Sequence, residues 1–349
     1  MDLNLFQYEY PKELIAQEPL PERDSSRMMV LDRDQQTWEH SQFKNFPDTL
    51  RAGDLLVLND TKVFPARLFG KNEKNRNIEI LLLRTVDHEL STIDHGPWTM
   101  DQKTWACLAK PCRKIGVGDM IQFDGGLQGR VTEKTDGFLK IVFEADDFKK
   151  RLEEIGYPPL PPYIKRDQHE WKKEFDKNRY QTVFAKHLGS AAAPTASFHF
   201  TENLLEQIQK KGVEIATVTL HVSTDTFLPV RENDIRQHKM HGERFSIPEQ
   251  TVAKVLKAKK EERRVIGVGT TAVRALESDW TKPTTDIFIY PGYSFKIVSA
   301  MLTNFHQPGS TPLLMISALA GREWVLKAYE EAIKRRYRLF SYGDCMLIL

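Results

Sequence analysis

Residues 265–278 read VIGVGTTAVRALES, and they set the fold class of this chain. Val265 to Val268 is a short apolar run of the kind that forms a buried strand, and Thr270 to Ser278 has the composition of a short helix. A strand that passes through one glycine directly into a helix is the building unit of α/β proteins. This stretch therefore indicates an α/β fold.

Strands and helices keep alternating on both sides of this unit. A helix is expected to start after Thr201, its N-cap, and to end before Gly212. Ser246 and Glu249 have the spacing of a capping box, which predicts a helix running to about Arg264. The other expected elements are a β-rich run over 213–222, strands near 286–290 and 296–302, helices over 312–336 and a final strand over 344–349. We predict an α/β fold with a mixed, partly parallel sheet and flanking helices.

One long segment follows a different pattern. Short β-type runs, among them 78–83 and 138–143, are separated there by Gly, Asp and Asn. The proline-rich stretch 156–166, GYPPLPPYIKR, predicts a stiff, extended return from this segment. We expect a small β-barrel or sandwich. The predicted division is a discontinuous α/β catalytic domain of residues 1–65 and 155–349, and an inserted β-barrel-like domain of residues 66–154.

The composition is that of an ordinary globular protein and argues against disorder and a fibrous fold. Of the 349 residues, 40% are apolar and 28% are charged. We expect no secretory leader, and the apolar stretch 313–320 is too short to span a bilayer. The three cysteines are too few for a disulfide framework or a four-cysteine zinc site. We therefore expect a cytoplasmic protein without a membrane partner.

Charge alone does not indicate a nucleic-acid-binding protein, because the formal net charge is +2. The positive charge is nevertheless concentrated in two segments, 254–264 and 334–338. Such runs are usually solvated helix faces, and they permit RNA binding without showing it.

Two segments place polar residues where a chain leaves a sheet. Asn59, Asp60, Lys62 and Arg67 follow the apolar run that ends at Leu58, and ligands of open α/β sheets bind at the carboxyl ends of strands. An Asx-turn with surface charges is the alternative. Thr270, Thr271 and Arg274 lie at the predicted helix start, where backbone N–H groups favour an anion; a simple capped turn is the alternative.

Three histidines at the edges of apolar runs are candidates for proton transfer: His199, His221 and His306. A lone histidine in such a place is more often a hydrogen-bonded structural group. His238 and His241 have a spacing that suits a metal, but the sequence offers no evident third ligand, so we predict no metal site.

Ordered blocks along the whole chain resemble those of one enzyme family. FQYEYPKELIAQEPLPERDSSRMMVLDR (6–33) is similar to the family's opening, and GDLLVLNDTKVFPARLFG (53–70) is similar to its next block. The remaining blocks are PLPPYIKR, RYQTVFAK, APTASFHFT, TLHV, HKMH, VGTTAVRALES, TNFH and YRLFSYGDCMLIL. Each block is short, but their number and order make the resemblance to this family, the S-adenosylmethionine:tRNA ribosyltransferase-isomerases, specific.

The resemblance implies a reaction that the residues alone do not name. The family transfers and isomerises the ribosyl moiety of S-adenosylmethionine onto 7-aminomethyl-7-deazaguanine at the tRNA wobble position. The product is epoxyqueuosine-tRNA, and adenine and methionine are released. S-adenosylmethionine is consumed as a substrate, so no cofactor is expected. The family fold is an α/β domain interrupted by a β-barrel, usually in a monomer.

The resemblance also implies roles for the residues in matching blocks. His199, His221 and His306 are the expected groups for proton transfer, and His221→Ala is expected to lower turnover by about 10² or more. The expected S-adenosylmethionine-binding residues are Thr270, Thr271, Arg274, Thr303 and Asn304. The expected deazaguanine- or tRNA-binding residues are Asn59, Asp60, Lys62, Arg67, Arg179, Tyr180 and Gln181.

Two departures from the family pattern keep other functions open. Ser223, Thr224 and Asp225 stand where the family has a glycine-rich stretch, and Ser197 replaces another glycine. Asp225→Gly is therefore expected to be tolerated or to raise activity. A catalytically altered paralogue that binds RNA or a modified nucleoside is the alternative. A methyltransferase is less favoured, because no glycine-rich loop follows an early strand.

Overall fold

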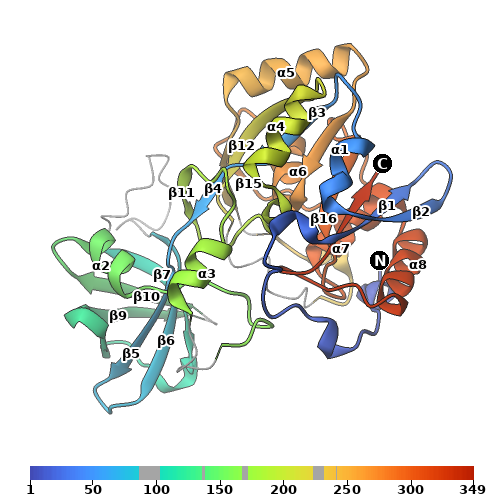
Figure 1. Cartoon of the computed structure of the whole chain (residues 1–349). Helices are drawn as coiled ribbons and strands as arrows, with labels where there is room; N and C mark the ends of the chain where they lie inside the picture. Colours follow the sequence, from blue (N-terminus) through green and yellow to red (C-terminus); the bar gives the residue numbers. More distant parts are fainter. Residues whose placement is uncertain (86–102, 136–137, 167–171, 223–231, 241) are drawn as a thin grey trace.

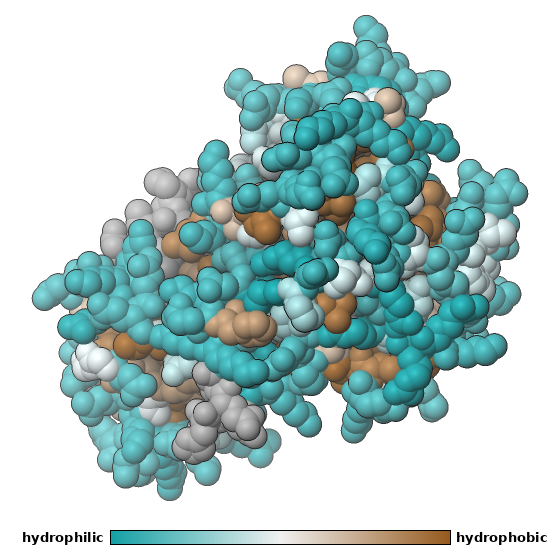
Figure 2. Space-filling view, in the orientation of Figure 1, coloured by the Kyte–Doolittle hydropathy of each residue, from teal (hydrophilic) through white to brown (hydrophobic). Residues whose placement is uncertain are grey.

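The computed structural model describes residues 1–85, 103–135, 138–166, 172–222, 232–240 and 242–349. Figure 1 shows an α/β part, which carries both ends of the chain, and a smaller β part beside it. Hydrophilic residues cover most of the face shown in Figure 2, with apolar residues in small patches. Among the described helices, none has the length and apolar composition needed to cross a membrane.

A nine-stranded mixed sheet forms the centre of the α/β part. In sheet order its strands are β15 (Thr284–Thr285), β13 (Glu243–Ser246), β12 (Glu214–Leu220), β3 (Leu55–Asn59), β14 (Val265–Val268), β16 (Ala300–Asn304), β17 (Cys345–Ile348), β1 (Arg27–Asp32) and β2 (Thr37–Gln42). The four strands β12, β3, β14 and β16 run parallel, so their carboxyl ends meet at one edge of the sheet. The prediction of a mixed, partly parallel sheet is confirmed.

Helices cover both faces of this sheet because its central strands are apolar on both sides. Every residue of β3 and β14 is buried, as expected for strands with helices on each face. The helices are α1 (Phe46–Thr49), α4 (Glu202–Lys210), α5 (Glu249–Lys260), α6 (Gly269–Glu277), α7 (Thr311–Ala320) and α8 (Arg322–Lys334). Helices α1 and α4 pack into one apolar cluster, and α5 to α8 pack into the cluster on the other face.

The β part is a closed six-stranded antiparallel barrel. Around the barrel the strands are β10 (Phe138–Glu144), β7 (Thr104–Lys110), β6 (Asn77–Thr85), β5 (Arg67–Asn72), β8 (Met120–Phe123) and β9 (Gln128–Thr135). Trp105, Ile141 and Phe143 fill its core, and α2 (Phe148–Ile155) packs beside it. None of these strands joins the nine-stranded sheet, which confirms the fold class. The domain boundaries stay a prediction.

Two short elements link the parts. Strands β4 (Thr61–Val63) and β11 (His187–Ser190) form a separate two-stranded parallel sheet, and α3 (Lys173–Arg179) lies nearby in sequence. Arg67 and Tyr157 exchange backbone hydrogen bonds of 2.8 and 3.0 Å where the chain enters and leaves the barrel. The entry and return segments therefore lie side by side.

Local predictions were right where one residue decides the geometry. The Thr201 hydroxyl accepts a hydrogen bond from the Leu204 backbone N–H at 3.1 Å, and Gly212 has a φ of +85° after α4. The capping box at Ser246 is wrong, because this serine ends β13 and pairs with Thr219 of β12.

The strand predictions near 286–290 and 296–302 also need correction. Residues 286–290, all of which the structure describes, form no strand, and β16 begins only at Ala300. Ile289 is 1% exposed, and Ile287, Phe288 and Tyr290 are partly buried against the core, without joining a β ladder. Apolar periodicity reports burial and cannot by itself distinguish a strand from an extended buried loop.

Candidate active site

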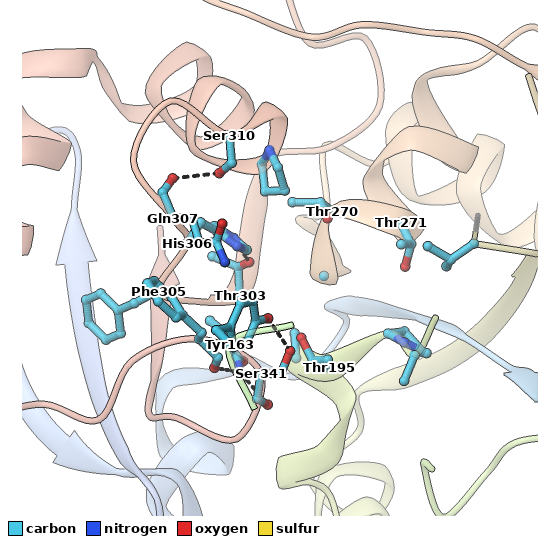
Figure 3. Close-up of a pocket in the computed structure, with 18 residues that line it drawn as sticks. Tyr163, Thr195, Thr270, Thr271, Thr303, Phe305, His306, Gln307, Ser310 and Ser341 are labelled. Atoms are coloured by element: carbon cyan, nitrogen blue, oxygen red, sulfur yellow. Dashed lines mark hydrogen bonds between the residues drawn. The ribbon is translucent and has the colours of Figure 1, made fainter. Parts of the chain in front are cut away.

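A pocket opens at the edge of the sheet where the parallel strands end, and Figure 3 shows the side chains around it. It holds about 710 Å³ of empty space including its open mouth. This is the edge at which ligands of open α/β sheets bind. Its lining residues are Tyr163, Ala193, Pro194, Thr195, Ala196, Val222, Gly269, Thr270, Thr271, Thr303, Asn304, Phe305, His306, Gln307, Ser310, Pro312, Phe340 and Ser341.

The start of α6 forms one wall of this pocket. Gly269 has a φ of +80°, which glycine adopts without strain, so the chain turns sharply from β14 into the helix. Thr270 and Thr271 follow and line the pocket. Asn59, from the end of β3, donates to the Thr271 hydroxyl at 3.1 Å and to the Leu220 carbonyl at 3.0 Å. Asn59 is fully buried and holds the ends of three elements together, which positions Thr271.

Thr303, near the end of β16, and His306, just after the strand, line the opposite wall (Figure 3). His306 Nε2 lies 2.7 Å from Thr303 Oγ1, and the His306 backbone N–H donates to the Tyr329 hydroxyl at 2.8 Å. Tyr8 donates its hydroxyl proton to the His306 carbonyl. Burial lowers the pKa of His306 to about 3, so its imidazole is neutral near pH 7. A neutral imidazole beside a pocket is available as a proton acceptor.

His199 lies behind the pocket wall, and both of its ring nitrogens have partners. Nδ1 lies 2.9 Å from Ser26 Oγ, and Nε2 lies 3.0 Å from Asn304 Oδ1. The Asn304 amide donates to the carbonyls of Phe340 and Ser341, so its oxygen accepts and His199 Nε2 carries the proton. Burial lowers the pKa of His199 to about 4. This arrangement favours a positioning role for His199 over direct proton transfer.

Phe340, which His199 supports through Asn304, is strained. Its φ is +70°, an unusual value for a bulky residue, and it lines the pocket beside Ser341. Such strain persists only when surrounding contacts hold it, and it concentrates at functional sites.

His221 belongs to a second polar group, at the ends of β3 and β12. Its Nδ1 lies 2.8 Å from Thr61 Oγ1, while the Thr219 hydroxyl donates to the Asp60 carboxylate at 2.6 Å. Burial, together with the nearby His187 and Arg244, lowers the pKa of His221 to about 4. This group adjoins the pocket through Val222 but does not line it.

Arg274 faces a smaller hollow that shares Thr270 and Thr271 with the pocket. Its guanidinium forms an ion pair with Glu243, and the two side chains are only 5% and 2% exposed. The Arg274 Nη2 atom is buried and has no hydrogen-bond partner among the described residues. The remaining lining residues are Met240, Ile287, Phe288, Ile289, Thr311, Pro312 and Met315.

Several residues expected to bind tRNA are engaged elsewhere. Arg67 is paired with Glu79, and Arg179 donates to the carbonyls of Leu20 and Pro21 at 2.6 and 2.8 Å. Tyr180 is 1% exposed. Gln181 forms two hydrogen bonds of 3.1 Å with the backbone of Val63. The structure does not bring these four residues to the pocket, whereas Lys62 is exposed on β4.

Sequence reasoning missed several pocket residues. Tyr163 and Ser341 are joined through their hydroxyls at 2.6 Å, and Ser310 donates to the Gln307 carbonyl at 2.7 Å (Figure 3). Tyr163 lies in PLPPYIKR and Ser341 in YRLFSYGDCMLIL, so the blocks contained the signal without showing which residues face inward.

Some sequence predictions fall outside the described residues, namely those on Ser223, Thr224, Asp225 and His241. Ser197 is fully buried in the 3-10 turn Thr195–His199 and does not line the pocket. Within the described part of the chain, no group of three or more His, Cys, Asp or Glu residues is arranged to hold a metal ion.

The buried histidines predict a steep loss of stability in mild acid. His199, His221 and His306 have lowered pKa values of about 4, 4 and 3, so the unfolded chain binds up to three more protons than the folded protein. Above about pH 6.5 these histidines are neutral in both the folded and the unfolded chain, so they do not reduce the free energy of unfolding. As pH falls toward 4 they are protonated only in the unfolded chain, and the free energy of unfolding decreases. Each additional proton bound by the unfolded chain lowers the free energy of unfolding by about 1.4 kcal/mol per pH unit. Denaturant unfolding at several pH values between 7.5 and 5 measures this decrease. A free energy of unfolding that stays constant over this range would contradict the prediction.

Comparison with known proteins identifies the family. A family model described as queuosine biosynthesis protein matches residues 3–348. The S-adenosylmethionine:tRNA ribosyltransferase-isomerase of Sulfurihydrogenibium sp. is 47% identical over 354 residues, and that of Halothermothrix orenii is 47% identical over 361 residues; both alignments cover 100% of each chain. The structure also resembles the crystal structure of S-adenosylmethionine tRNA ribosyltransferase from Thermotoga maritima, with a TM-score of 0.54 and 36% sequence identity. The match covers 99% of this chain and 100% of the Thermotoga chain. The chain belongs to the S-adenosylmethionine:tRNA ribosyltransferase-isomerase family of queuosine biosynthesis proteins.

Proposed function

We propose that this protein transfers and isomerises the ribosyl moiety of S-adenosylmethionine onto 7-aminomethyl-7-deazaguanine at the wobble position of tRNA. Epoxyqueuosine-tRNA, adenine and methionine are the products, and no cofactor takes part. The observation that carries the proposal is the pocket at the carboxyl edge of the sheet, in which a neutral histidine, His306, lies opposite the start of α6. We further propose that the protein acts in the cytoplasm as a monomer.

His306 is our candidate for the group that takes the proton from the carbon next to the sulfonium. The reaction needs a base at the pocket that is unprotonated at physiological pH, and His306 lines the pocket as a neutral imidazole. Thr303, 2.7 Å from the imidazole, orients the ring. His199 acts indirectly, because Asn304 and Ser26 occupy its two nitrogens.

Arg274 is our candidate for the methionine carboxylate. Its Nη2 atom is the unpartnered donor beside the smaller hollow, and its charge is held in place by Glu243. The apolar side chains of Met315 and Phe288 suit the methylene groups of the methionine moiety. Asp60 remains the candidate partner for the aminomethyl group, because Thr219 fixes its carboxylate at the adjoining strand end.

The test is to incubate the protein with S-adenosylmethionine and a tRNA that carries 7-aminomethyl-7-deazaguanine. We expect a mass increase in the tRNA that corresponds to epoxyqueuosine, together with release of adenine and methionine. Formation of S-adenosylhomocysteine would instead indicate methyl transfer. Tight binding of both substrates without any product would contradict the proposed activity.

A further inference from the structure

The ribbon formed by β4 and β11, residues 61–63 and 187–190, leaves the sheet beside the second polar group. Figure 1 shows it between the barrel and the α/β part. The Asp60 carbonyl accepts hydrogen bonds from the backbone N–H groups of Lys186 and His187 at 2.8 and 3.2 Å. The ribbon is therefore fixed directly to the carboxyl end of β3, next to the candidate acceptor site.

The pairing of the two strands gives the ribbon two different faces. His187 pairs with Thr61, and Leu188 pairs with Lys62. Paired residues of neighbouring strands project to the same side, and successive residues alternate. Thr61 and His187 therefore share one face of the ribbon. On this face Thr61 Oγ1 lies 2.8 Å from His221 Nδ1, and His187 Nε2 lies 3.7 Å from Asp60 Oδ2.

The opposite face of the ribbon is cationic. Lys62 shares this face with Leu188. Lys186 comes directly before β11, where its backbone N–H is bound to the Asp60 carbonyl. Both lysines are exposed, and neither forms an ion pair with any residue in the described ranges. Leu188 packs against the barrel core, so the Lys62 charge lies on the side of the ribbon toward the barrel, and the Lys186 charge lies at the start of the paired strand.

The basic segment 254–264 is less suited to an RNA substrate. The Leu55 backbone N–H donates to the Arg264 carbonyl, so the end of this segment lies at the amino end of β3, opposite the pocket edge. Arg263 is paired with Glu214 and Glu261, and Arg264 is paired with Asp54. Their charge is already compensated.

We infer that Lys62 and Lys186 form a docking surface for the phosphates of single-stranded RNA next to the nucleotide that enters the site. The inference rests on the proposed function, because it assumes that the acceptor base belongs to RNA. Phosphate contacts position a nucleic acid without reading its sequence, and flexible ammonium groups suit this role. Unpaired loop nucleotides expose both their phosphates and a base that can leave the stack.

The test compares two double variants that each remove two positive charges. Lys62→Ala with Lys186→Ala is the test variant, and Lys257→Ala with Lys259→Ala on exposed positions of α5 is the matched control. Binding of the tRNA and of its anticodon stem–loop is measured at several salt concentrations. The test variant is expected to show a shallower slope of log K against log salt, by roughly 0.7–0.9 for each phosphate that is no longer neutralised.

If each lysine neutralises one phosphate, this change of slope means that at 0.1 M salt the test variant binds roughly five- to eightfold more weakly for each lysine removed. Replacing both lysines with arginine should keep the slope, because charge is what the phosphates bind. The inference is overturned if the test variant keeps the slope of the unchanged protein, if the control is weakened as much, or if the stem–loop shows no difference. The readout is binding, so it is independent of turnover: absence of product with the unchanged protein would contradict the proposed function alone.

Discussion

The Glu243→Gln variant is expected to unfold with a free energy about 3–5 kcal/mol lower than that of the unchanged protein. Glu243 and Arg274 are almost completely buried, and Glu243 is the only carboxylate that pairs with Arg274 among the described residues. Removing one charge leaves the other inside the protein without compensation, which is far more costly than the pair itself is stabilising. Denaturant unfolding followed by fluorescence and by circular dichroism measures the difference.

A second variant separates the cost of an unpaired charge from a loss of packing. Glu243→Leu combined with Arg274→Met removes both charges, and buried pairs replaced by apolar residues are often neutral or more stable. We expect this variant to regain most of the missing stability. Glu206→Gln, which removes an exposed pair with Lys210 on α4, is the control and should cost less than about 1 kcal/mol. Equal losses for Glu243→Gln and Glu206→Gln would contradict the predicted cost of leaving the Arg274 charge buried without a partner.

The His306→Ala variant is expected to lose about 10²–10⁴ in turnover, the usual contribution of a general acid or base. Among the three candidate histidines, His306 is the one that lines the pocket. Its pKa of about 3 keeps it unprotonated, so the activity of the unchanged protein should not fall between pH 8 and 6 through its titration. Release of adenine at saturating S-adenosylmethionine measures the turnover.

Variants of the other histidines show whether a loss of turnover is specific to His306. His40, which contacts Tyr337 on the β2 side of the sheet, is the control, and His40→Ala should leave turnover unchanged. His199→Ala should act mainly through the turn of Phe340, with a smaller effect on turnover than on substrate binding. If His306→Ala keeps its rate while His221→Ala loses about 10², the base is His221 and the reaction takes place at the second polar group.

The fold was predictable where local chemistry and tertiary structure agree. Val265–Val268 is buried on both faces and leads through Gly269 into a helix, so the sequence contains the complete α/β unit. Ser246 shows the limit, because a capping serine and the last residue of an edge strand have the same local pattern. Only pairing with Thr219, 27 residues earlier in the chain (246 minus 219), decides between them.

The site was predictable as a set of segments, and its internal geometry was not. TNFH indicated Thr303, Asn304 and His306, which the structure places at one pocket edge. Arg274 of α6 has its partner, Glu243, on strand β13, 31 residues away, and no local pattern joins the two. Arg179 looked like a free cation in the sequence, yet two backbone carbonyls hold it. Hydrogen bonds between distant segments decide whether a polar residue faces a ligand or supports the fold.

The position of β17 between β16 and β1 has a consequence for biosynthesis. Met29 of β1 aligns with Met346 of β17, so the hairpin of β1 and β2 has no neighbour in the sheet until residues 345–348 have left the ribosome. An isolated two-stranded hairpin is at best marginally stable in water. The nascent chain is therefore expected to keep the apolar residues Met28 and Leu31 accessible to chaperones for most of translation. Ribosome-bound chains stopped before residue 345 should be cleaved by protease within β1, and chains extended past residue 349 by a linker should resist.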